Sequence, residues 1–149
     1  MPAASDLPRT FRPLGPRIVG IVVGASLFGL CAITWFFAFS AKTRSEFTWD
    51  QSLTLLLIGL GIAAVLHALI RSRITATETG LIVVNGYRKR VFEWAQIVAI
   101  RLPAGAPWVT LDLADGSACS AMGIQGSDGG RARAQVRTLR ALLTQHTDA

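Results

Sequence analysis

Charged residues are missing from two long stretches of this sequence. No Asp, Glu, Lys or Arg occurs at residues 18–41 or at residues 51–70. An α-helix rises about 1.5 Å per residue, so a helix of about 20 apolar residues crosses a hydrocarbon layer about 30 Å thick. Both stretches reach that length, which argues against a fully water-soluble protein. The sequence predicts a membrane α-helical hairpin whose transmembrane helices occupy residues 18–40 and 52–70.

Residue types that carry out catalysis or bind metals are also scarce. The chain has two cysteines, Cys31 and Cys119, and two histidines, His67 and His146. One cysteine lies within the first span and the other far outside it, so we expect no disulfide. His67 is expected to be an interfacial polar residue rather than part of a proton path, and His146 to lie in a short tail at residues 146–149. No motif of a nucleophile, a metal site or a phosphate loop occurs, and we expect no enzyme, no cofactor and no metal.

Basic residues are few in the link between the spans and more numerous outside it. The link, at residues 41–51, carries Lys42 and Arg44, whereas residues 1–17 form a basic tail. Cytoplasmic segments carry the excess of Lys and Arg, so we expect a plasma-membrane protein with both termini in the cytoplasm and the link outside. The net charge of +6 would also suit nucleic acid, but no aromatic residues interleave the basic ones, and we expect no nucleic-acid partner. The basic residues that flank the hairpin are Arg9, Arg12, Arg17, Arg71, Arg73, Arg88, Lys89 and Arg90.

A cleaved signal peptide is an alternative interpretation of the first span. Ala38 and Ser40 are small and fit the −3 and −1 positions of a cleavage site. The apolar run is longer than the usual stretch of about 7–15 residues, however, and a second span follows it. An uncleaved membrane anchor is therefore the favoured interpretation.

Small residues recur at four-residue spacing in both spans. Gly20 and Gly24 form such a pair in the first span, and Gly59 and Ala63 form one in the second. Small residues let helix backbones approach closely, and dispersion between close helices drives their association in lipid. We expect the two spans to pack on each other; dimerisation of the chain through Gly20 and Gly24 is the alternative.

From residue 72 onwards the continuous apolar runs give way to short alternating ones. Alternation of apolar and polar residues predicts strands, and Asn85-Gly86 and Asp115-Gly116 are strong signals for tight hairpin turns between them. In the favoured turn with Asn-Gly, both of those residues adopt φ > 0. The expected strands occupy residues 73–77, 81–84, 87–93, 97–102, 108–113 and 118–124.

The last part of the sequence has a helical period. Residues 131–145 place apolar side chains at helical spacing, and either Ser127 or Asp128 is expected to cap this helix. One flank of the apolar stripe carries Arg133, Arg137 and Arg140. This flank is a candidate site for phosphates or an acidic partner, and the alternative is a solvated helix face. The apolar positions of the helix are Ala132, Val136, Leu139, Leu142 and Leu143.

Four segments of this region resemble bacterial pleckstrin-homology (PH-like) domains. Arg-Ile-Thr-Ala-Thr-Glu-Thr-Gly-Leu at residues 73–81 resembles their first hairpin, and Val-Phe-Glu-Trp-Ala-Gln-Ile at residues 91–97 a later segment. Pro-Trp-Val-Thr-Leu-Asp-Leu-Ala-Asp-Gly at residues 107–116 and Met-Gly-Ile-Gln at residues 122–125 are similar to actinobacterial members related to low-molecular-weight protein antigen 6. The resemblance implies, for residues 72–145, an antiparallel PH-like barrel of seven strands with a C-terminal helix, although only about six strands are predicted from the pattern. Two preceding spans also fit that group.

The basic residues Arg88, Lys89 and Arg90 are the candidate binding site of this domain. Many eukaryotic PH domains bind phosphoinositides through basic residues in the first hairpin loop, but here that loop, at residues 77–80, is short and acidic. Near an anionic leaflet each basic residue contributes about 1 kcal/mol of attraction. The three residues therefore suit anionic lipid or a partner protein, and the alternative is a solvated strand whose charges protect a sheet edge.

The short connection between the second span and the domain bears on this choice. Only Arg71 and Ser72 separate them, so the domain cannot leave the membrane surface and needs no lipid affinity to reach it. We therefore expect an interaction module, a scaffold or accessory subunit with an unidentified protein partner; an anionic-lipid-sensing domain is the alternative. Trp94 and Trp108 are candidates to line a pocket, with core packing favoured for both.

Overall fold

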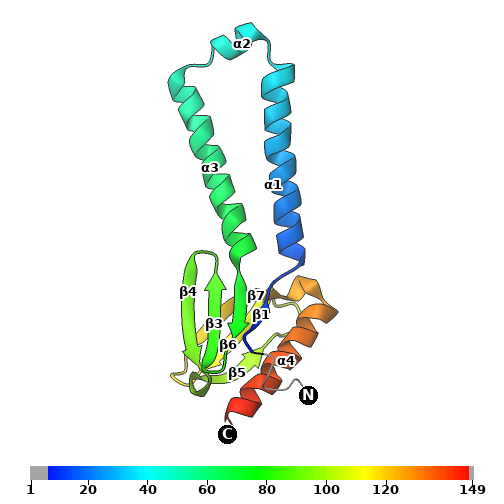
Figure 1. The fold of residues 1–149 in the computed structure, drawn as a ribbon, viewed down its shortest axis with the longest axis vertical. Helices are drawn as coiled ribbons and strands as arrows, with labels where there is room; N and C mark the ends of the chain where they lie inside the picture. The colour runs from blue at the N-terminus through cyan, green and yellow to red at the C-terminus, as the bar shows by residue number, and fades with distance from the viewer. Residues whose placement is uncertain (1–6, 148–149) are drawn as a thin grey trace. The chain divides into compact units, whose positions relative to one another are not determined.

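The computed structural model describes residues 7–147, which divide into two compact units (Figure 1). The helical unit consists of residues 16–70. The β-domain combines the described residues up to Gly15 with those from Arg71 onwards. The hairpin is therefore an insertion within the β-domain, because part of that domain precedes it in the sequence and the rest follows it.

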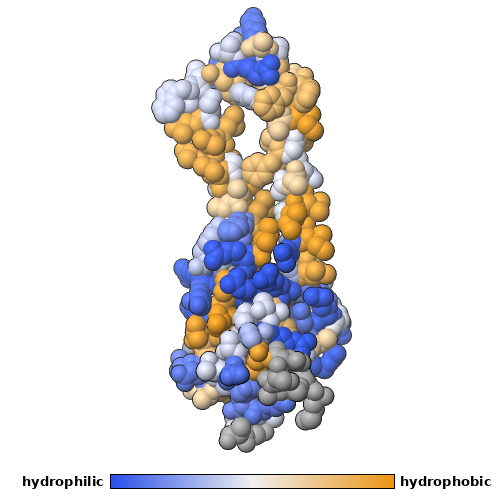
Figure 2. Space-filling view, in the orientation of Figure 1, coloured by the Kyte–Doolittle hydropathy of each residue, from blue (hydrophilic) through white to orange (hydrophobic). Residues whose placement is uncertain are grey.

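The helical unit holds two helices that are long and apolar enough to cross a membrane. The first consists of α1 (Gly15–Ile33) and the π-helix η2 (Thr34–Ala38), and the second is α3 (Trp49–Arg71). The short helix α2 (Ala41–Ser45) lies in the link between them. Figure 2 shows hydrophobic surface along both long helices and hydrophilic surface on the link. The predicted spans agree with these helices to within a few residues at each end.

Small residues of the helical unit lie against its other long helix. A Cβ atom on Gly20 would lie 3.6 Å from Ile70, and one on Gly24 would lie 3.0 Å from Leu66. A Cβ atom on Gly59 would lie 3.7 Å from Phe28. Packing of the two spans on each other uses these glycines, and dimerisation through them stays a prediction.

The link end of the helical unit is lined by aromatic residues. The ring of Trp35 lies 5.1 Å from that of Phe47 and 6.1 Å from that of Phe39. The guanidinium group of Arg44 donates hydrogen bonds to the carbonyls of Trp35 and Phe36, at 3.3 and 3.4 Å. These bonds satisfy carbonyls at the end of a helix that has no further turn to pair with them.

The β-domain consists of two antiparallel sheets and a C-terminal helix. Strands of the first sheet lie in the order β1-β2-β3-β4 and those of the second in the order β5-β6-β7. The strands of the first sheet are β1 (Arg9–Phe11), β2 (Arg73–Ala76), β3 (Gly80–Asn85) and β4 (Arg88–Glu93). The other elements are the 3₁₀ turn η3 (Trp94–Gln96), β5 (Ile97–Arg101), β6 (Trp108–Leu113), β7 (Ala118–Gln125), the 3₁₀ turn η4 (Gly126–Asp128) and α4 (Gly130–Thr147). All six predicted strands and the predicted helix are present, and the architecture expected from the sequence is confirmed.

The seventh strand, β1, comes from residues that precede the helical hairpin. Thr10 pairs with Thr75 and Phe11 with Ile74 in an antiparallel ladder with β2. Phe11 is 3% exposed, and its side chain belongs to the core of the β-domain. The structure differs here from the expectation of a basic tail at residues 1–17. The strand is too short to show an alternating pattern, and the residues that bury it lie more than sixty positions away.

Apolar side chains from both sheets and from α4 form one core. Alternate residues of β2, Ile74 and Ala76, are buried in this core. Leu139 of α4 belongs to the same core. Trp94 is a core residue, as favoured; its indole N–H donates to the carbonyl of Thr77 at 3.1 Å. The ring of His146 stacks on Trp94 with the centroids 4.8 Å apart, so His146 belongs to α4 and not to a tail.

The two sheets approach each other closely at Gly123. A Cβ atom at this position of β7 would lie 2.4 Å from the backbone nitrogen of Ile74 and 2.5 Å from the carbonyl carbon of Arg73. Both neighbours are backbone atoms of a buried strand, so neither can rotate away. A side chain at position 123 would force β2 and β7 apart.

We therefore expect Gly123→Ala to lower the free energy of unfolding by about 1–3 kcal/mol, the usual cost of overpacking a core. Gly130→Ala is the matched control, because a Cβ atom there meets nothing within 4 Å and alanine favours the helix that begins at this residue. Chemical denaturation of the purified full chain, followed by near-UV circular dichroism, measures both. Equal stability of the two variants would contradict the close approach of the strands.

Candidate functional site

The three basic residues of β4 lie on both faces of the strand. Arg88, Lys89 and Arg90 are all exposed. Because side chains alternate along a strand, Arg88 and Arg90 share the face of the buried Phe92, whereas Lys89 shares the opposite face with Val91, which is 61% exposed. The predicted basic cluster is therefore divided between the two sides of β4.

Arg88 and Arg90 line a small groove against the beginning of β7. The other side of this groove is formed by Ala118, Cys119 and Ser120. The guanidinium group of Arg90 lies 3.9 Å from the sulfur of Cys119, which is buried and not in a disulfide. The two arginines thus lie side by side along this groove.

The hairpin turn before β4 differs from the predicted one by one residue. Asn85 pairs with Arg88, so the two turn residues are Gly86 and Tyr87. Gly86 has φ of 59° and, among the described residues, positive φ occurs only at glycines. The expectation that Asn85 adopts positive φ was therefore wrong, because Asn85 is the last residue of β3.

The side chain of Asn85 joins the two sheets. Its amide N–H donates to the carbonyl of Ser120 at 2.6 Å, and its oxygen accepts from the backbone N–H of Met122 at 2.9 Å. These two bonds occupy backbone groups on the outer edge of β7. The sequence pattern places Asn85 in the turn and does not indicate this role, since its partners lie more than thirty residues further along the chain.

The same turn lies beside the last residue of α3. The guanidinium group of Arg71 lies over the ring of Tyr87, 5.5 Å from its centroid. The backbone N–H of Gly86 donates to the hydroxyl of the buried Ser72 at 3.1 Å. The beginning of β4 is therefore fixed close to the point where the chain enters the β-domain from the second long helix.

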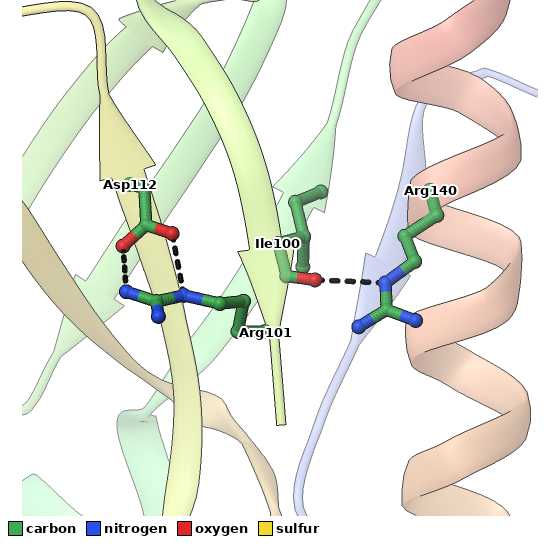
Figure 3. Close-up of polar contacts among 4 residues, drawn as sticks. All are labelled: Ile100, Arg101, Asp112 and Arg140. Carbon is green, nitrogen blue, oxygen red and sulfur yellow. Dashed lines mark hydrogen bonds and ion pairs between the residues drawn. The ribbon is translucent and has the colours of Figure 1, made fainter. Parts of the chain in front are cut away.

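The outer edge of β5 is covered by an arginine of α4. The Nε–H of Arg140 donates to the carbonyl of Ile100 at 2.8 Å (Figure 3). On β5 itself, Arg101 forms a two-bonded ion pair with Asp112 of the adjacent strand. The hydrogen bond to Asp112, together with its charge, raises the pKa of Arg101.

The arginine stripe predicted on the last helix does not form a single site. Arg140 is engaged with β5, as described above. Arg133 lines a cavity between the loop at residues 102–107 and the turn at residues 126–129, and Arg137 is exposed. The three side chains thus have three different surroundings, and only Arg133 faces a concave surface.

Asp128 was one of two residues expected to cap the C-terminal helix, but it contacts the start of α1 instead. Its carboxylate accepts hydrogen bonds from the backbone N–H groups of Leu14 and Gly15, at 2.8 and 2.9 Å. Gly15 is the first residue of α1, so Asp128 satisfies free N–H groups at the start of that helix. A Cβ atom on Gly15 would lie 2.9 Å from the same carboxylate, which favours glycine at this position.

Residues with catalytic potential are engaged in structural contacts. His146 bonds to the carbonyl of Leu142 and stacks on Trp94. The carboxylate of Asp115 accepts a hydrogen bond from the backbone N–H of Ser117 at 2.8 Å. Hydrogen bonding from Ser117 lowers the pKa of Asp115. Within residues 7–147, no group of three or more His, Cys, Asp or Glu side chains is placed to hold a metal ion.

Comparison with known proteins bears on the β-domain. Residues 71–142 match the family model of the bacterial PH domain. The match begins at the end of α3 and therefore leaves out β1. No solved structure matches the chain.

The relatives found are uncharacterised mycobacterial proteins. Two come from Mycobacterium tuberculosis strains and one from Mycobacterium bovis, and each is 33% identical over 89 residues. The aligned part is 60% of this chain and 58% of each relative, so the chain covers little more than half the length of those proteins. The expected resemblance to actinobacterial PH-like proteins is confirmed.

Proposed function

We propose that the chain is a membrane-held interaction module whose residues 71–142, which match the bacterial PH domain model, form a PH-like domain. In this proposal the helical hairpin spans the plasma membrane, and the PH-like domain lies at its cytoplasmic face. There it binds a partner protein as a scaffold or accessory subunit.

The pairing of β1 with β2 is the observation that supports this function best. β1 precedes α1 and β2 follows α3, so the β-domain is connected to both long helices. At the first connection, Gly15 belongs to the β-domain and is also the first residue of α1. At the second connection, only Ser72 separates α3 from β2. A domain tethered twice needs no affinity for lipid in order to stay at the membrane. Its exposed surfaces are thus free to bind protein.

The proposed role is not catalytic. The side chains best suited to acid–base chemistry, His146 and Asp112, are engaged with Trp94 and Arg101. Such contacts hold each side chain in one orientation, which suits a structural role.

Recognition of anionic lipid is the second candidate. It is favoured by the contact of Arg71 with Tyr87, because an arginine and a tyrosine at the end of an apolar helix are typical of the bilayer interface. Arg88 follows directly and would add a second positive charge at that depth. This role would orient the domain rather than recruit it.

Affinity purification in mild detergent tests the proposed function. We expect a partner protein to co-purify in stoichiometric amount with the full chain but not with a control that contains only residues 16–70, because the partner contacts the β-domain. Recovery of the full chain alone, or equal recovery of the partner by the hairpin, would contradict the proposal. Reconstitution into vesicles with and without anionic lipid tests the second candidate, which requires the protease sensitivity of the β-domain to change with lipid charge.

A further inference from the structure

We propose that the outer edge of β4 is the docking site for an acidic, extended segment of the partner protein. This segment would add to the first sheet as a fifth strand, next to Arg88, Lys89 and Arg90. The inference rests on the proposed function and assigns the surface and the chemistry of the partner.

Two sheets have four edges; in the described part of the chain two of them carry side-chain hydrogen bonds and a third belongs to a very short strand. The edge of β5 is covered by Arg140, and that of β7 by the side chain of Asn85. The edge of β1 belongs to a strand of only three residues, between Pro8 and Pro13. Short strands and nearby prolines are common ways of blocking an edge.

The edge of β4 is the one available for pairing. β4 has six residues and, within residues 7–147, pairs only with β3, so alternate residues direct their N–H and C=O groups outward. Figure 1 shows β4 as the outermost strand of its sheet, with no other strand beside its outer edge. Six residues are enough for a partner strand of ordinary length.

Charge determines which kind of strand fits. A second copy of this chain, paired antiparallel over the whole of β4, would place an acidic residue opposite Arg88 only and would leave Lys89 and Arg90 opposite Phe92 and Val91. Opposite charges across the pair are favourable, so an acidic segment is the complementary occupant.

The alternation of the three basic residues favours a strand over a flat lipid surface. A membrane would contact one face of the sheet and therefore either Lys89 or the pair Arg88 and Arg90. A strand added at the edge extends both faces, and its own alternating side chains reach all three. In an antiparallel arrangement, acidic residues would lie opposite Arg88, Lys89 and Arg90, and an apolar residue opposite the exposed Val91.

The probe for this site is the fluorescent peptide acetyl-Lys-Thr-Val-Glu-Glu-Glu-Thr-amide. Its three Glu residues face the basic positions of β4 and its Lys faces Glu93 in an antiparallel pair. Binding is measured by fluorescence anisotropy on the full chain in nanodiscs of neutral phosphatidylcholine. We expect binding that weakens with added salt.

Two variants with the same change of charge locate the site. The double substitution Arg88→Glu and Lys89→Glu should weaken binding about tenfold or more, since each favourable cross-strand pair becomes a repulsive one. The same change at Arg133 and Arg137, which are exposed on α4, should have little effect. Near-UV circular dichroism confirms that both variants remain folded.

A peptide of the same sequence, N-methylated at alternate residues, tests strand addition itself. It keeps the charges but cannot form the ladder of hydrogen bonds, and we expect it not to bind. Binding that survives N-methylation, no binding of the acidic peptide at low salt, or an equal loss with the α4 variant would each overturn the assignment. The assignment would also be overturned if the full chain bound phosphatidylglycerol vesicles through Arg88 and Lys89 and did not bind the peptide. If a partner still co-purifies with the full chain, the proposed function stands without this site; if none does, both fail.

Discussion

A chain that begins at residue 72 will not form a stable β-domain, whereas residues 1–15 joined to residues 71–149 by a short Gly-Ser linker will fold and stay in solution. The two chains differ chiefly by β1. Removing β1 exposes the edge of β2 and removes Phe11 from the core. Phe11 pairs with Ile74, so a short linker suffices to connect the two segments in place of the hairpin.

The expected loss is large in relation to the stability of so small a domain. Truncating a buried phenylalanine costs about 3–5 kcal/mol. Domains are stabilised by about 0.05–0.15 kcal/mol per residue, so a domain of this size has about 5–14 kcal/mol in all. Loss of the whole strand also leaves backbone groups of β2 unpaired, and the truncated chain should be largely unfolded or aggregated.

Single substitutions in the linked chain separate the effect of Phe11 from that of length. Phe11→Ala should lower the free energy of unfolding by about 3–5 kcal/mol. Thr10→Ala, at the exposed position beside it, should cost less than about 1 kcal/mol. Urea denaturation followed by tryptophan fluorescence reports on this, because the linked chain retains only Trp94 and Trp108. Equal urea midpoints for the linked chain and for residues 72–149 would show that β1 contributes nothing.

The features predicted correctly from the sequence are those that depend on local pattern. Residues 108–113 alternate cleanly, and β6 occupies that range. Ala132, Val136 and Leu139 recur at helical spacing, and all three are buried in α4. A period of 2 or 3.6 residues shows which face of an element is apolar, and that is enough to predict the element.

The features that were missed depend on contacts between distant parts of the chain. β1 has no periodic pattern of its own, and it becomes a strand only because β2 offers an edge and the core accepts Phe11. Either Ser127 or Asp128 was expected to cap the helix that follows, yet the partners of Asp128, Leu14 and Gly15, lie more than one hundred residues earlier. No local rule identifies such partners.

The candidate site was found only in part for the same reason. Arg88, Lys89 and Arg90 are exposed basic residues, as their sequence suggests. That they border a sheet edge follows from the strand order, in which β4 is the last strand, and the edges of β5 and β7 are contacted by Arg140 and Asn85. Those two residues are unremarkable in the sequence, since one belongs to a charged helix and the other to a turn signal.

A membrane-impermeant maleimide applied to intact cells will label Ser45→Cys and will not label Thr10→Cys or Thr144→Cys. Thr10 lies in β1, Ser45 in α2 of the link, and Thr144 in α4. Each variant carries Cys31→Ala, and the buried Cys119 is retained. The parent without an introduced cysteine gives the background.

The pairing of β1 with β2 makes this prediction strict. Two strands of one sheet must lie on the same side of a membrane, so the helices between them must cross it an even number of times or not at all. Thr10 and Thr144 must therefore give the same result, and cleavage of the first helix as a signal peptide would remove β1 from the domain. Different labelling of these two positions would contradict either the strand pairing or the span.

The pairing also supports the proposal that the domain lies in the cytoplasm. Taken alone, residues 1–17 exceed the link by a single basic residue, since they carry Arg9, Arg12 and Arg17 against Lys42 and Arg44. Because β1 holds that segment on the same side as β2, the basic residues on both flanks of the hairpin act together, and all of them oppose the two in the link. Labelling of Thr10→Cys and Thr144→Cys but not of Ser45→Cys would place the domain outside the cell, and labelling of all three would show that the helices do not span.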